Sequence, residues 1–303
     1  MNKIPEELKV KLEKIATENN VLILSFIAPD AVLKVSPTSF SYASIENKDI
    51  YNLEKTIEEM KENASLPDKL HLIIQTPGGA LSTSFKIANY LRKVFQEIQV
   101  FIPYEASSGG TLMCLAANKI TMSDFANLTP IDPQVIYKGE RVSAYRIIEA
   151  VDSFQKKFGE TRPLDIPPPW QQMGEKFDPI IYHEMDTSVW QSIFYASRLL
   201  KKSGYPEKES TLIAVQLART AYSHGHCIDS VEAKEIGLNI CNDEKSLALL
   251  KEYKNYLSIR LKETVDYHII ESFAPQKDKK DAENTVTEKK SETIKAPQTT
   301  TVS

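Results

Sequence analysis

Short apolar runs alternate with helical patterns between residues 20 and 125 of the chain. The runs with the length of buried strands are residues 21–27 (VLILSFI), 70–75 (LHLIIQ), 98–103 (IQVFIP) and 120–122 (ITM). Apolar spacing predicts helices over residues 47–63, over 80–94 and from 108 to about 117. Strands that alternate with helices pair with one another in parallel, and the helices form right-handed crossover connections between them. This region therefore predicts an α/β fold. Spacing alone does not distinguish a doubly wound sheet from other α/β folds.

The second half of the chain is mostly helical in pattern. Helices are expected over residues 142–158, 183–203, 209–222, 232–236 and 244–270. The proline-rich stretch 163–179 predicts a non-helical excursion or loop, because proline disrupts a helix interior. Residues 275–303 contain no aromatic residue and many Lys, Glu and Thr residues, which predicts a disordered polar tail. We expect one folded domain over residues 1–274, with an insert at about 160–180.

Composition and charge exclude several classes of protein. Of 303 residues, 42% are hydrophobic and 26% are charged, which is typical of a soluble globular protein. A net charge of −4 gives no reason to expect nucleic acid or an anionic membrane as a partner. The apolar runs are too short to cross a bilayer, and the chain does not begin with a signal-peptide pattern. The three cysteines lack metal-ligand spacing, so we expect a cytoplasmic protein without a metal.

Two glycine-rich turns carry the candidate chemistry. Thr76-Pro77-Gly78-Gly79 follows one predicted strand, and Ser107-Ser108-Gly109-Gly110 follows the next. Each has an ordinary explanation: the first as a plain strand-to-helix turn, the second as a serine cap before closely packed glycines. Consecutive strand–helix units, however, place both turns at the same sheet edge. There, backbone N–H groups near a helix start could stabilise an oxyanion beside a serine nucleophile.

The segments around these turns resemble the serine dehydrogenase proteinase family, which is related to the Clp protease proteolytic subunit and to signal peptide peptidase A. The resemblance lies in LHLIIQTPGGALSTSFKIANYLR (70–92), YEASSGGTLMCLAANKITM (104–122), LTPIDPQ (128–134) and SHGHCIDSVEAKEIGL (223–238). It implies a Clp/crotonase-like fold of repeated strand–helix units with additional C-terminal helices. It further implies peptide-bond hydrolysis without a cofactor, with Ser108 as the nucleophile. No GxGxxG nicotinamide fingerprint is present.

The resemblance also implies the oxyanion hole and limits the choice of general base. The hole would use the backbone amides of Gly78 or Gly79 and of Gly109. In the Clp subunit a histidine follows the serine, and an aspartate comes later in the chain. Here Asp132 occupies the first location, and His224 and His226 occupy the second. Because chain order does not matter to a triad, we expect His224 to accept the proton and Asp132 to orient it.

Other interpretations remain open at the sequence level. Asp132 could cap a turn and His224 could be a surface residue. Signal peptide peptidase A relatives use a serine–lysine dyad, for which Lys138 or Lys156 would be the base. Rival functions are an acyl-CoA enzyme of the crotonase type and an inactive Clp-like scaffold. The partners implied are a peptide or protein substrate, other copies of the chain in a homo-oligomer, and a separate unfoldase or membrane partner.

The remaining histidines have weaker patterns. His71 lies inside an apolar run and is expected to be a packed or edge residue. His183 and His268 lie in helical patterns without evident partners, so ordinary surface roles are expected for both.

Overall fold

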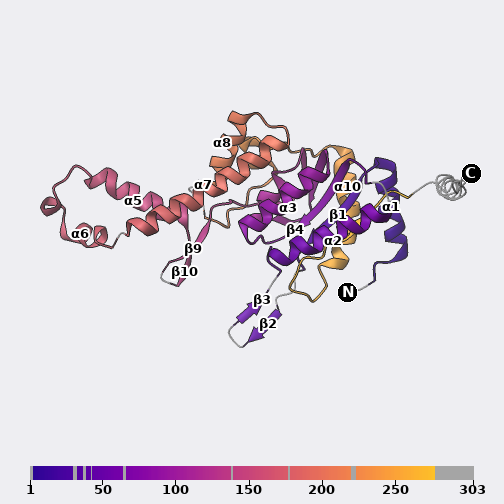
Figure 1. Cartoon of the computed structure of the whole chain (residues 1–303), viewed down its shortest axis with the longest axis horizontal. Helices are drawn as coiled ribbons and strands as arrows, with labels where there is room; N and C mark the ends of the chain where they lie inside the picture. The colour runs from indigo at the N-terminus through magenta and orange to yellow at the C-terminus, as the bar shows by residue number, and fades with distance from the viewer. Residues whose placement is uncertain are drawn as a thin grey trace, which may run out of the picture.

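The computed structural model describes most of the chain up to residue 276. The described residues are 3–29, 33–36, 39–41, 43–63, 66–137, 139–176, 178–219 and 223–276. The candidate base Lys138 and almost all of the predicted polar tail lie outside these ranges. The fold is α/β, as predicted, with a body built on a parallel sheet and an arm of helices that extends from it (Figure 1).

A five-stranded sheet forms the centre of the body. Its order is β11 (Ser272–Phe273), β1 (Leu22–Ile27), β4 (Lys69–Gln75), β5 (Glu97–Ile102) and β7 (Lys119–Met122). The last four strands run parallel, and β11 pairs with β1 in the antiparallel direction. These four are the strands predicted from the apolar runs. Because they are parallel, their carboxyl ends meet at one edge of the sheet.

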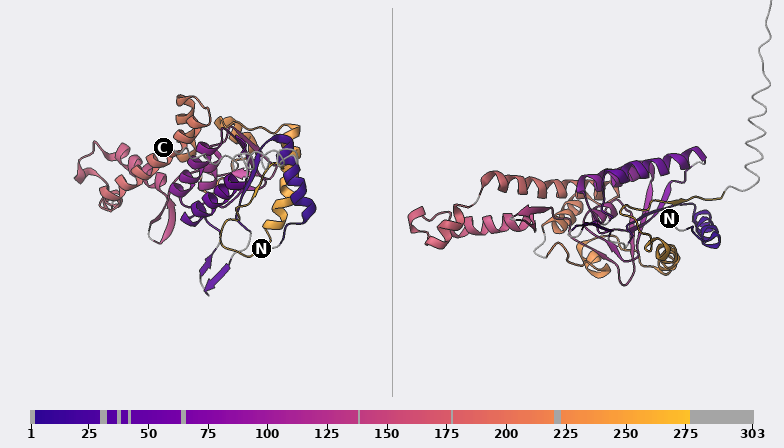
Figure 2. Two further views of the ribbon diagram at one scale, coloured as in Figure 1. Left: turned by 45° about the vertical axis from the view of Figure 1, so that its right-hand side comes forward. Right: turned by 90° about the horizontal axis from the view of Figure 1, so that it is seen from below.

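Helices cover both faces of the sheet (Figure 2). One face carries α1 (Glu6–Asn19) and α10 (Glu244–Arg260); the other carries α2 (Asn47–Asn63), α3 (Leu81–Val94) and α4 (Gly109–Cys114). Alternate strand residues supply the two cores: Leu22 and Leu24 belong to the cluster with α2 and α3, whereas Ile23 packs with α1 and α10. All of β1 is therefore buried, which explains its unbroken apolar run.

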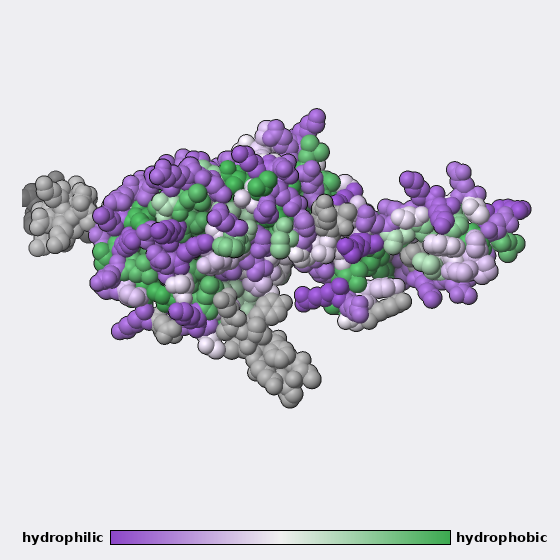
Figure 3. All heavy atoms as spheres, turned by 180° about the vertical axis from the view of Figure 1, so that it is seen from behind, coloured by the Kyte–Doolittle hydropathy of each residue, from purple (hydrophilic) through white to green (hydrophobic). Residues whose placement is uncertain are grey.

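The arm consists of helices from the middle of the chain. It contains the hairpin β9 (Gln134–Tyr137)–β10 (Glu140–Ser143), α5 (Ala144–Phe158), the 3₁₀ turn η1 (Pro163–Asp165), α6 (Pro168–Gly174) and the start of α7 (Pro179–Lys202). The later part of α7 returns to the body, where Ile193 and Leu199 join the main core. From behind, hydrophobic side chains are visible on the arm and at its base (Figure 3). The remaining elements are β2 (Leu33–Ser36), β3 (Ser39–Ser41), β6 (Glu105–Ala106), β8 (Asn127–Leu128), α8 (Glu207–Ala218) and α9 (Ser230–Ile236).

Two predicted segments differ from the structure. The proline-rich stretch was expected to be non-helical, but it contains η1 and α6. Pro168 and Pro169 lie in the first turn of α6, where a backbone N–H would have no helical acceptor, so they do not disrupt it. The helix expected over residues 244–270 ends at Arg260, and the chain then runs extended beside β1. Among the described helices, none is both long and apolar enough to cross a bilayer.

Candidate active site

The two glycine-rich turns are hydrogen-bonded to each other at the carboxyl edge of the sheet. Thr76 and Ala106 form a parallel bridge. The N–H of Thr76 donates to the carbonyl of Glu105 at 3.0 Å, and the N–H of Ser107 donates to the carbonyl of Thr76 at 3.0 Å. The predicted convergence of the turns after β4 and β5 is therefore present in the backbone itself.

Ser108 has a strained backbone at the junction of β6 and α4. Its φ of 49° and ψ of −109° lie in a region that non-glycine residues rarely adopt. The conformation is held by the Ser108 N–H, which donates to Thr129 Oγ1 at 2.8 Å. A serine on such a sharp strand-to-helix turn presents its hydroxyl at the sheet edge, as in nucleophile elbows. The neighbouring Ser107 is buried, and its hydroxyl donates to Glu105 Oε1 at 2.5 Å.

The Pro-Gly-Gly turn packs directly against Ser108. A methyl group on Gly78 would lie 2.9 Å from Ser108 Cβ and 3.2 Å from the nitrogen of Gly109. Gly78 and Gly79 have φ angles of 97° and 151°, which side chains would disfavour. On its other side the turn pairs with Ile45, whose N–H donates to Gly78 and whose carbonyl accepts from Ala80. Only glycine fits this position, because backbone lies close on both sides.

The three candidate amide donors are not equivalent. The N–H of Gly78 donates to Thr76 Oγ1 at 3.1 Å. Within the described part of the chain, the N–H groups of Gly79 and Gly109 donate to no other group. A methyl group on Gly109 would lie 3.4 Å from the nitrogen of Gly79, so these two amides are close neighbours. Two close, unused donors beside a serine are the elements of an oxyanion hole.

Asp132 and His224 form a hydrogen-bonded pair. His224 Nδ1 lies 2.7 Å from Asp132 Oδ1, and the Asp132 side chain is 1% exposed whereas that of His224 is 30% exposed. The second carboxylate oxygen accepts from Gln134 Nε2 at 2.8 Å. A carboxylate bonded to Nδ1 fixes the ring and leaves Nε2 as a proton acceptor.

A short segment connects this pair to the serine turn. In β8, Leu128 pairs with Ala106 of β6 and also forms an antiparallel bridge with Ile228. The next residue, Thr129, bonds to the Ser108 backbone, and Asp132 follows shortly after. The region from Leu128 to Asp132 therefore lies between the serine turn and the segment that carries His224.

Other predicted site residues lie elsewhere. His226 pairs with Glu232, at 2.9 and 3.0 Å from its two carboxylate oxygens. Lys156 is exposed near the end of α5, on the arm that extends away from the sheet (Figure 1). A lysine base must be desolvated, and Lys156 is not buried within this chain. Lys138 falls outside the described residues.

The structure also reveals residues that the sequence did not indicate. Thr129 holds the backbone of Ser108, although nothing in its local sequence distinguishes it from a turn residue. The expectation of a surface role for His268 was wrong: it is 1% exposed and bonds to Thr76 and Asp49. The Tyr-His-Ile-Ile run could have indicated a strand, because β-branched and aromatic residues favour sheets. His71, in contrast, is packed, as predicted.

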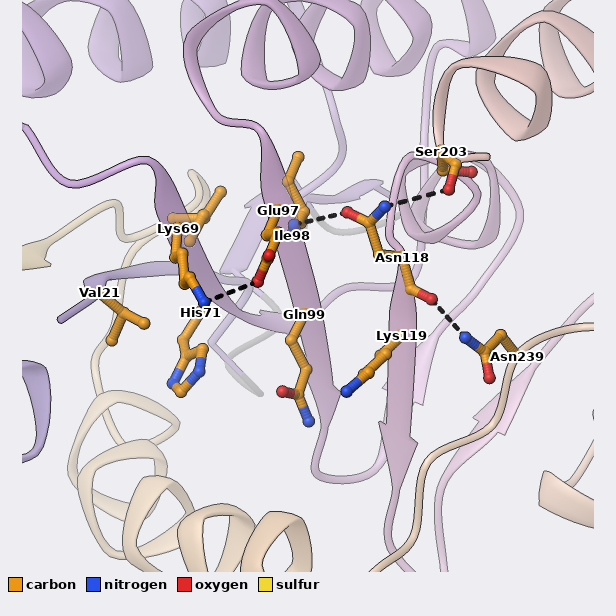
Figure 4. Close-up of a pocket in the computed structure, with 11 residues that line it drawn as sticks. Val21, Lys69, His71, Glu97, Ile98, Gln99, Asn118, Lys119, Ser203 and Asn239 are labelled. Atoms are coloured by element: carbon orange, nitrogen blue, oxygen red, sulfur yellow. Dashed lines mark hydrogen bonds and ion pairs between the residues drawn. The ribbon is translucent and has the colours of Figure 1, made fainter. Parts of the chain in front are cut away.

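A cavity of about 380 Å³ lies at the opposite edge of the sheet, where β4, β5 and β7 begin. Figure 4 shows its lining, which includes Lys69, His71, Gln99 and Lys119. Neither glycine turn contributes to this cavity, so the cavity and the candidate chemistry lie at different edges of the sheet. No cluster of three or more His, Cys, Asp or Glu side chains suited to a metal ion occurs within the described ranges.

Several known proteins are similar to parts of this chain. Two uncharacterized proteins of Methanocaldococcus jannaschii are relatives of this chain. The first is 29% identical over 220 residues, which cover 70% of this chain and 69% of the relative. The second is 28% identical over 174 residues, which cover 56% of this chain and 51% of the relative. Two solved structures of variants of the 1510-N membrane-bound stomatin-specific protease are also similar, the second in complex with a substrate peptide. The first is 16% identical with a TM-score of 0.42, and the alignment covers 69% of this chain and 80% of that structure. The second is 17% identical with a TM-score of 0.41, and the alignment covers 68% of this chain and 74% of that structure. The profile of the ClpP-like SDH-type serine proteinases matches residues 41–161, which include both glycine turns, Ser108 and Asp132. Over these residues the chain is similar to the ClpP-like SDH-type serine proteinases.

Proposed function

We propose that Ser108 is the nucleophile of this serine peptidase, with His224 as general base and Asp132 as the residue that orients it. The observation that carries the proposal is the contact between the two glycine turns, which packs the strained Ser108 against Gly78 and brings the amides of Gly79 and Gly109 close to each other. The family match supports peptide or protein substrates over acyl-CoA thioesters.

The proposed reaction is acyl transfer through a covalent intermediate. Ser108 Oγ attacks the peptide carbonyl while its proton passes to His224 Nε2. The negative charge that develops on the carbonyl oxygen is stabilised by the N–H groups of Gly79 and Gly109. The C–N bond then breaks, the proton passes from His224 to the leaving amine, and water hydrolyses the acyl-serine ester by the same steps.

Gly79 is preferred over Gly78 as the first donor for a chemical reason. The Gly78 N–H already donates to Thr76 Oγ1, and an amide committed to a neutral hydroxyl cannot also point at an oxyanion. The loss of one oxyanion donor typically costs about 3 kcal/mol of transition-state stabilisation.

Covalent labelling with a fluorophosphonate probe tests the nucleophile, and adjacent serines provide a matched control. We expect Ser108→Ala to abolish labelling, whereas Ser107→Ala should retain it, because the Ser107 hydroxyl is buried and bonded to Glu105. Labelling that survives in Ser108→Ala would refute the proposal. An absence of labelling in the wild-type chain would favour an inactive scaffold.

A second pair of variants tests the base. His224→Ala should lose most of the hydrolysis of a denatured, fluorescently labelled protein, and His226→Ala should retain it because His226 pairs with Glu232 instead. Loss in Lys156→Ala together with full activity in His224→Ala would favour the serine–lysine alternative.

A further inference from the structure

His268 lies buried beneath the Pro-Gly-Gly turn, far from the catalytic residues in the sequence. It belongs to the extended segment after α10, where Ile269 and Ile27 exchange backbone hydrogen bonds of 2.7 and 3.1 Å. The imidazole stacks on Phe26, with ring centroids 4.1 Å apart and planes inclined by 26°. Both the backbone and the ring of His268 are therefore held in place by strand β1.

Both ring nitrogens of His268 have buried partners. Nε2 lies 2.8 Å from Thr76 Oγ1, and Nδ1 lies 3.2 Å from Asp49 Oδ2. Asp49 is fully buried in the first turn of α2, where the helix dipole favours a negative charge, and its Oδ2 also accepts from the Glu46 N–H at 2.9 Å. Asp49 Oδ1 has no hydrogen-bond partner in the described part of the chain, so His268 is the main side-chain partner of this carboxylate.

The chemistry of the donors and acceptors fixes the direction of these hydrogen bonds. An ionised carboxylate only accepts, so the proton of a neutral His268 lies on Nδ1 and Nε2 is an acceptor. Thr76 then donates its hydroxyl proton to Nε2, and its oxygen accepts the N–H of Gly78 at 3.1 Å. Every group from the Gly78 amide to Asp49 Oδ2 thus has one consistent role.

We propose that Asp49, His268 and Thr76 form a buried relay that positions the oxyanion hole. The relay rests on the proposed function, because the turn that it holds carries the Gly79 donor. Its end point, the Gly78 N–H, fixes the plane of the peptide before the two glycines. Gly78 and Gly79 are conformationally permissive, so without that tether the Gly79 amide would sample directions away from the oxyanion. These are positioning residues: none of them is required to touch the substrate.

Substitutions at Thr76 separate positioning from packing. Thr76→Val keeps the shape but removes the hydroxyl, whereas Thr76→Ser keeps the hydroxyl. With the fluorophosphonate probe, we expect the maximal labelling rate of Thr76→Val to fall about 10²-fold, the lower end of the cost of one oxyanion donor, with the half-saturating concentration unchanged. Thr76→Ser should label close to the wild-type rate. Thr121→Val is the matched control, since it removes an equally buried hydroxyl that donates to Cys241 instead.

Labelling of Thr76→Val at the wild-type maximal rate would overturn the relay, as would equal losses in Thr76→Val and Thr121→Val. The corresponding pair of histidine variants is His268→Gln and His71→Gln, of which only the first should slow labelling.

A measurement on the inactive Ser108→Ala protein tests the relay without relying on activity. In ¹⁵N-histidine NMR spectra, we expect Nδ1 of His268 to carry a proton and Nε2 to carry none. A proton on Nε2 would contradict the direction of the relay. If the wild-type chain is not labelled by the probe, the proposed function fails and the catalytic role of the relay fails with it. If wild-type labelling is normal and depends on Ser108 but Thr76→Val has no effect, only the relay fails.

Discussion

Each edge of the parallel sheet holds a buried histidine whose ring bonds to a hydroxyl group. At the carboxyl edge His268 bonds to Thr76, and at the amino edge His71 Nδ1 lies 2.7 Å from the hydroxyl of Tyr253. The two edges differ in what these bonds support. The Thr76 hydroxyl also accepts the N–H of Gly78 in a strained turn, whereas Tyr253 is a core residue of α10.

The asparagine side chains of the amino edge form hydrogen bonds with backbone groups of neighbouring segments. Asn118 accepts the Ile98 N–H at 2.8 Å and donates to the Ser203 carbonyl at 3.0 Å, while Asn239 donates to the Asn118 carbonyl (Figure 4). At the carboxyl edge, helices begin beside unused N–H donors, and Ser108 combines a φ of 49° with a ψ of −109°. Asn20, before β1, has the same φ but a ψ of 56°, which is the left-handed conformation that asparagine tolerates. Available donors and backbone strain, rather than the presence of a cavity, therefore identify the candidate active site.

The largest predicted effect comes from an aspartate at the carboxyl edge, compared with an aspartate that only caps a helix. Asp132→Asn should reduce peptide hydrolysis about 10⁴-fold, because the amide would favour the wrong tautomer of His224. Asp243→Asn should leave hydrolysis unchanged, because Asp243 caps α10 and asparagine caps a helix about equally well. Steady-state hydrolysis of a labelled protein measures both. Similar rates for the two variants would show that Asp132 has no more to do with catalysis than a helix cap has.

Glycine substitutions should give the next largest effect. In Gly109→Ala the new methyl group would lie 2.4 Å from Ser84 Oγ, 3.2 Å from the Gly79 carbonyl oxygen and 3.4 Å from the Gly79 nitrogen. Even if the Ser84 hydroxyl rotates away, the methyl group presses on the Gly79 backbone and separates the two amide donors. We expect labelling of Ser108 to fall about 10²- to 10³-fold.

The matched control for this substitution is Gly204→Ala beside Ser203, at the amino edge. Gly204 has a φ of 104° with no atom within 4 Å of the new methyl group, so the change should cost about 1 kcal/mol of stability and leave labelling intact. Equal labelling losses in the two variants would mean that general destabilisation, rather than donor geometry, causes the effect.

Local patterns in the sequence were sufficient to predict much of the sheet and the turn that contains Ser108. The apolar runs located β1, β4, β5 and β7, because strands buried on both faces need no alternating pattern. The pairing of Asp132 with His224 is present in the structure, but it was predicted from the resemblance and not from local pattern. Local sequence was less informative for the proline-rich stretch, since prolines at a helix start and in a loop look alike.

Long-range contacts could not be predicted in this way. The relay joins Asp49, Thr76 and His268, and the position of His268 depends on the pairing of its segment with β1. A helical pattern extending past Arg260 concealed this pairing, because a short apolar run fits either structure. The same limit applies to Thr129, whose importance depends on a strand pair that no local motif specifies.

The amino-edge histidine should affect stability rather than catalysis, with a defined pH dependence. Burial lowers the pKa of His71 from 6.5 to about 4, and the positive charge of Lys245 acts in the same direction. In the unfolded chain His71 therefore binds a proton below about pH 6.5, whereas in the folded chain it does so only near pH 4. The stabilisation is complete above pH 6.5 and is lost as the pH falls through this window.

His71→Gln keeps a hydrogen-bonding group but does not titrate. The free energy of unfolding of the wild type should therefore fall relative to this variant by about 3 kcal/mol between neutral pH and pH 4. Urea unfolding at several pH values measures the difference, and labelling of Ser108 at neutral pH should be equal in the two proteins. Parallel pH profiles would show that His71 is protonated as easily in the folded chain as in the unfolded chain.

The smallest predicted effect concerns the ion pair at the rim of the amino-edge cavity. Lys69 Nζ lies 3.1 Å from Glu97 Oε2, but the side chains are 49% and 63% exposed, so water competes with their attraction. Lys69→Met should change the free energy of unfolding by less than about 1 kcal/mol, with the difference shrinking further in high salt. Because neither residue contacts the glycine turns, labelling of Ser108 should stay at the wild-type rate. A marked loss of labelling in Lys69→Met would mean that the two edges are coupled through β4, and that the amino edge contributes to catalysis as well as to stability.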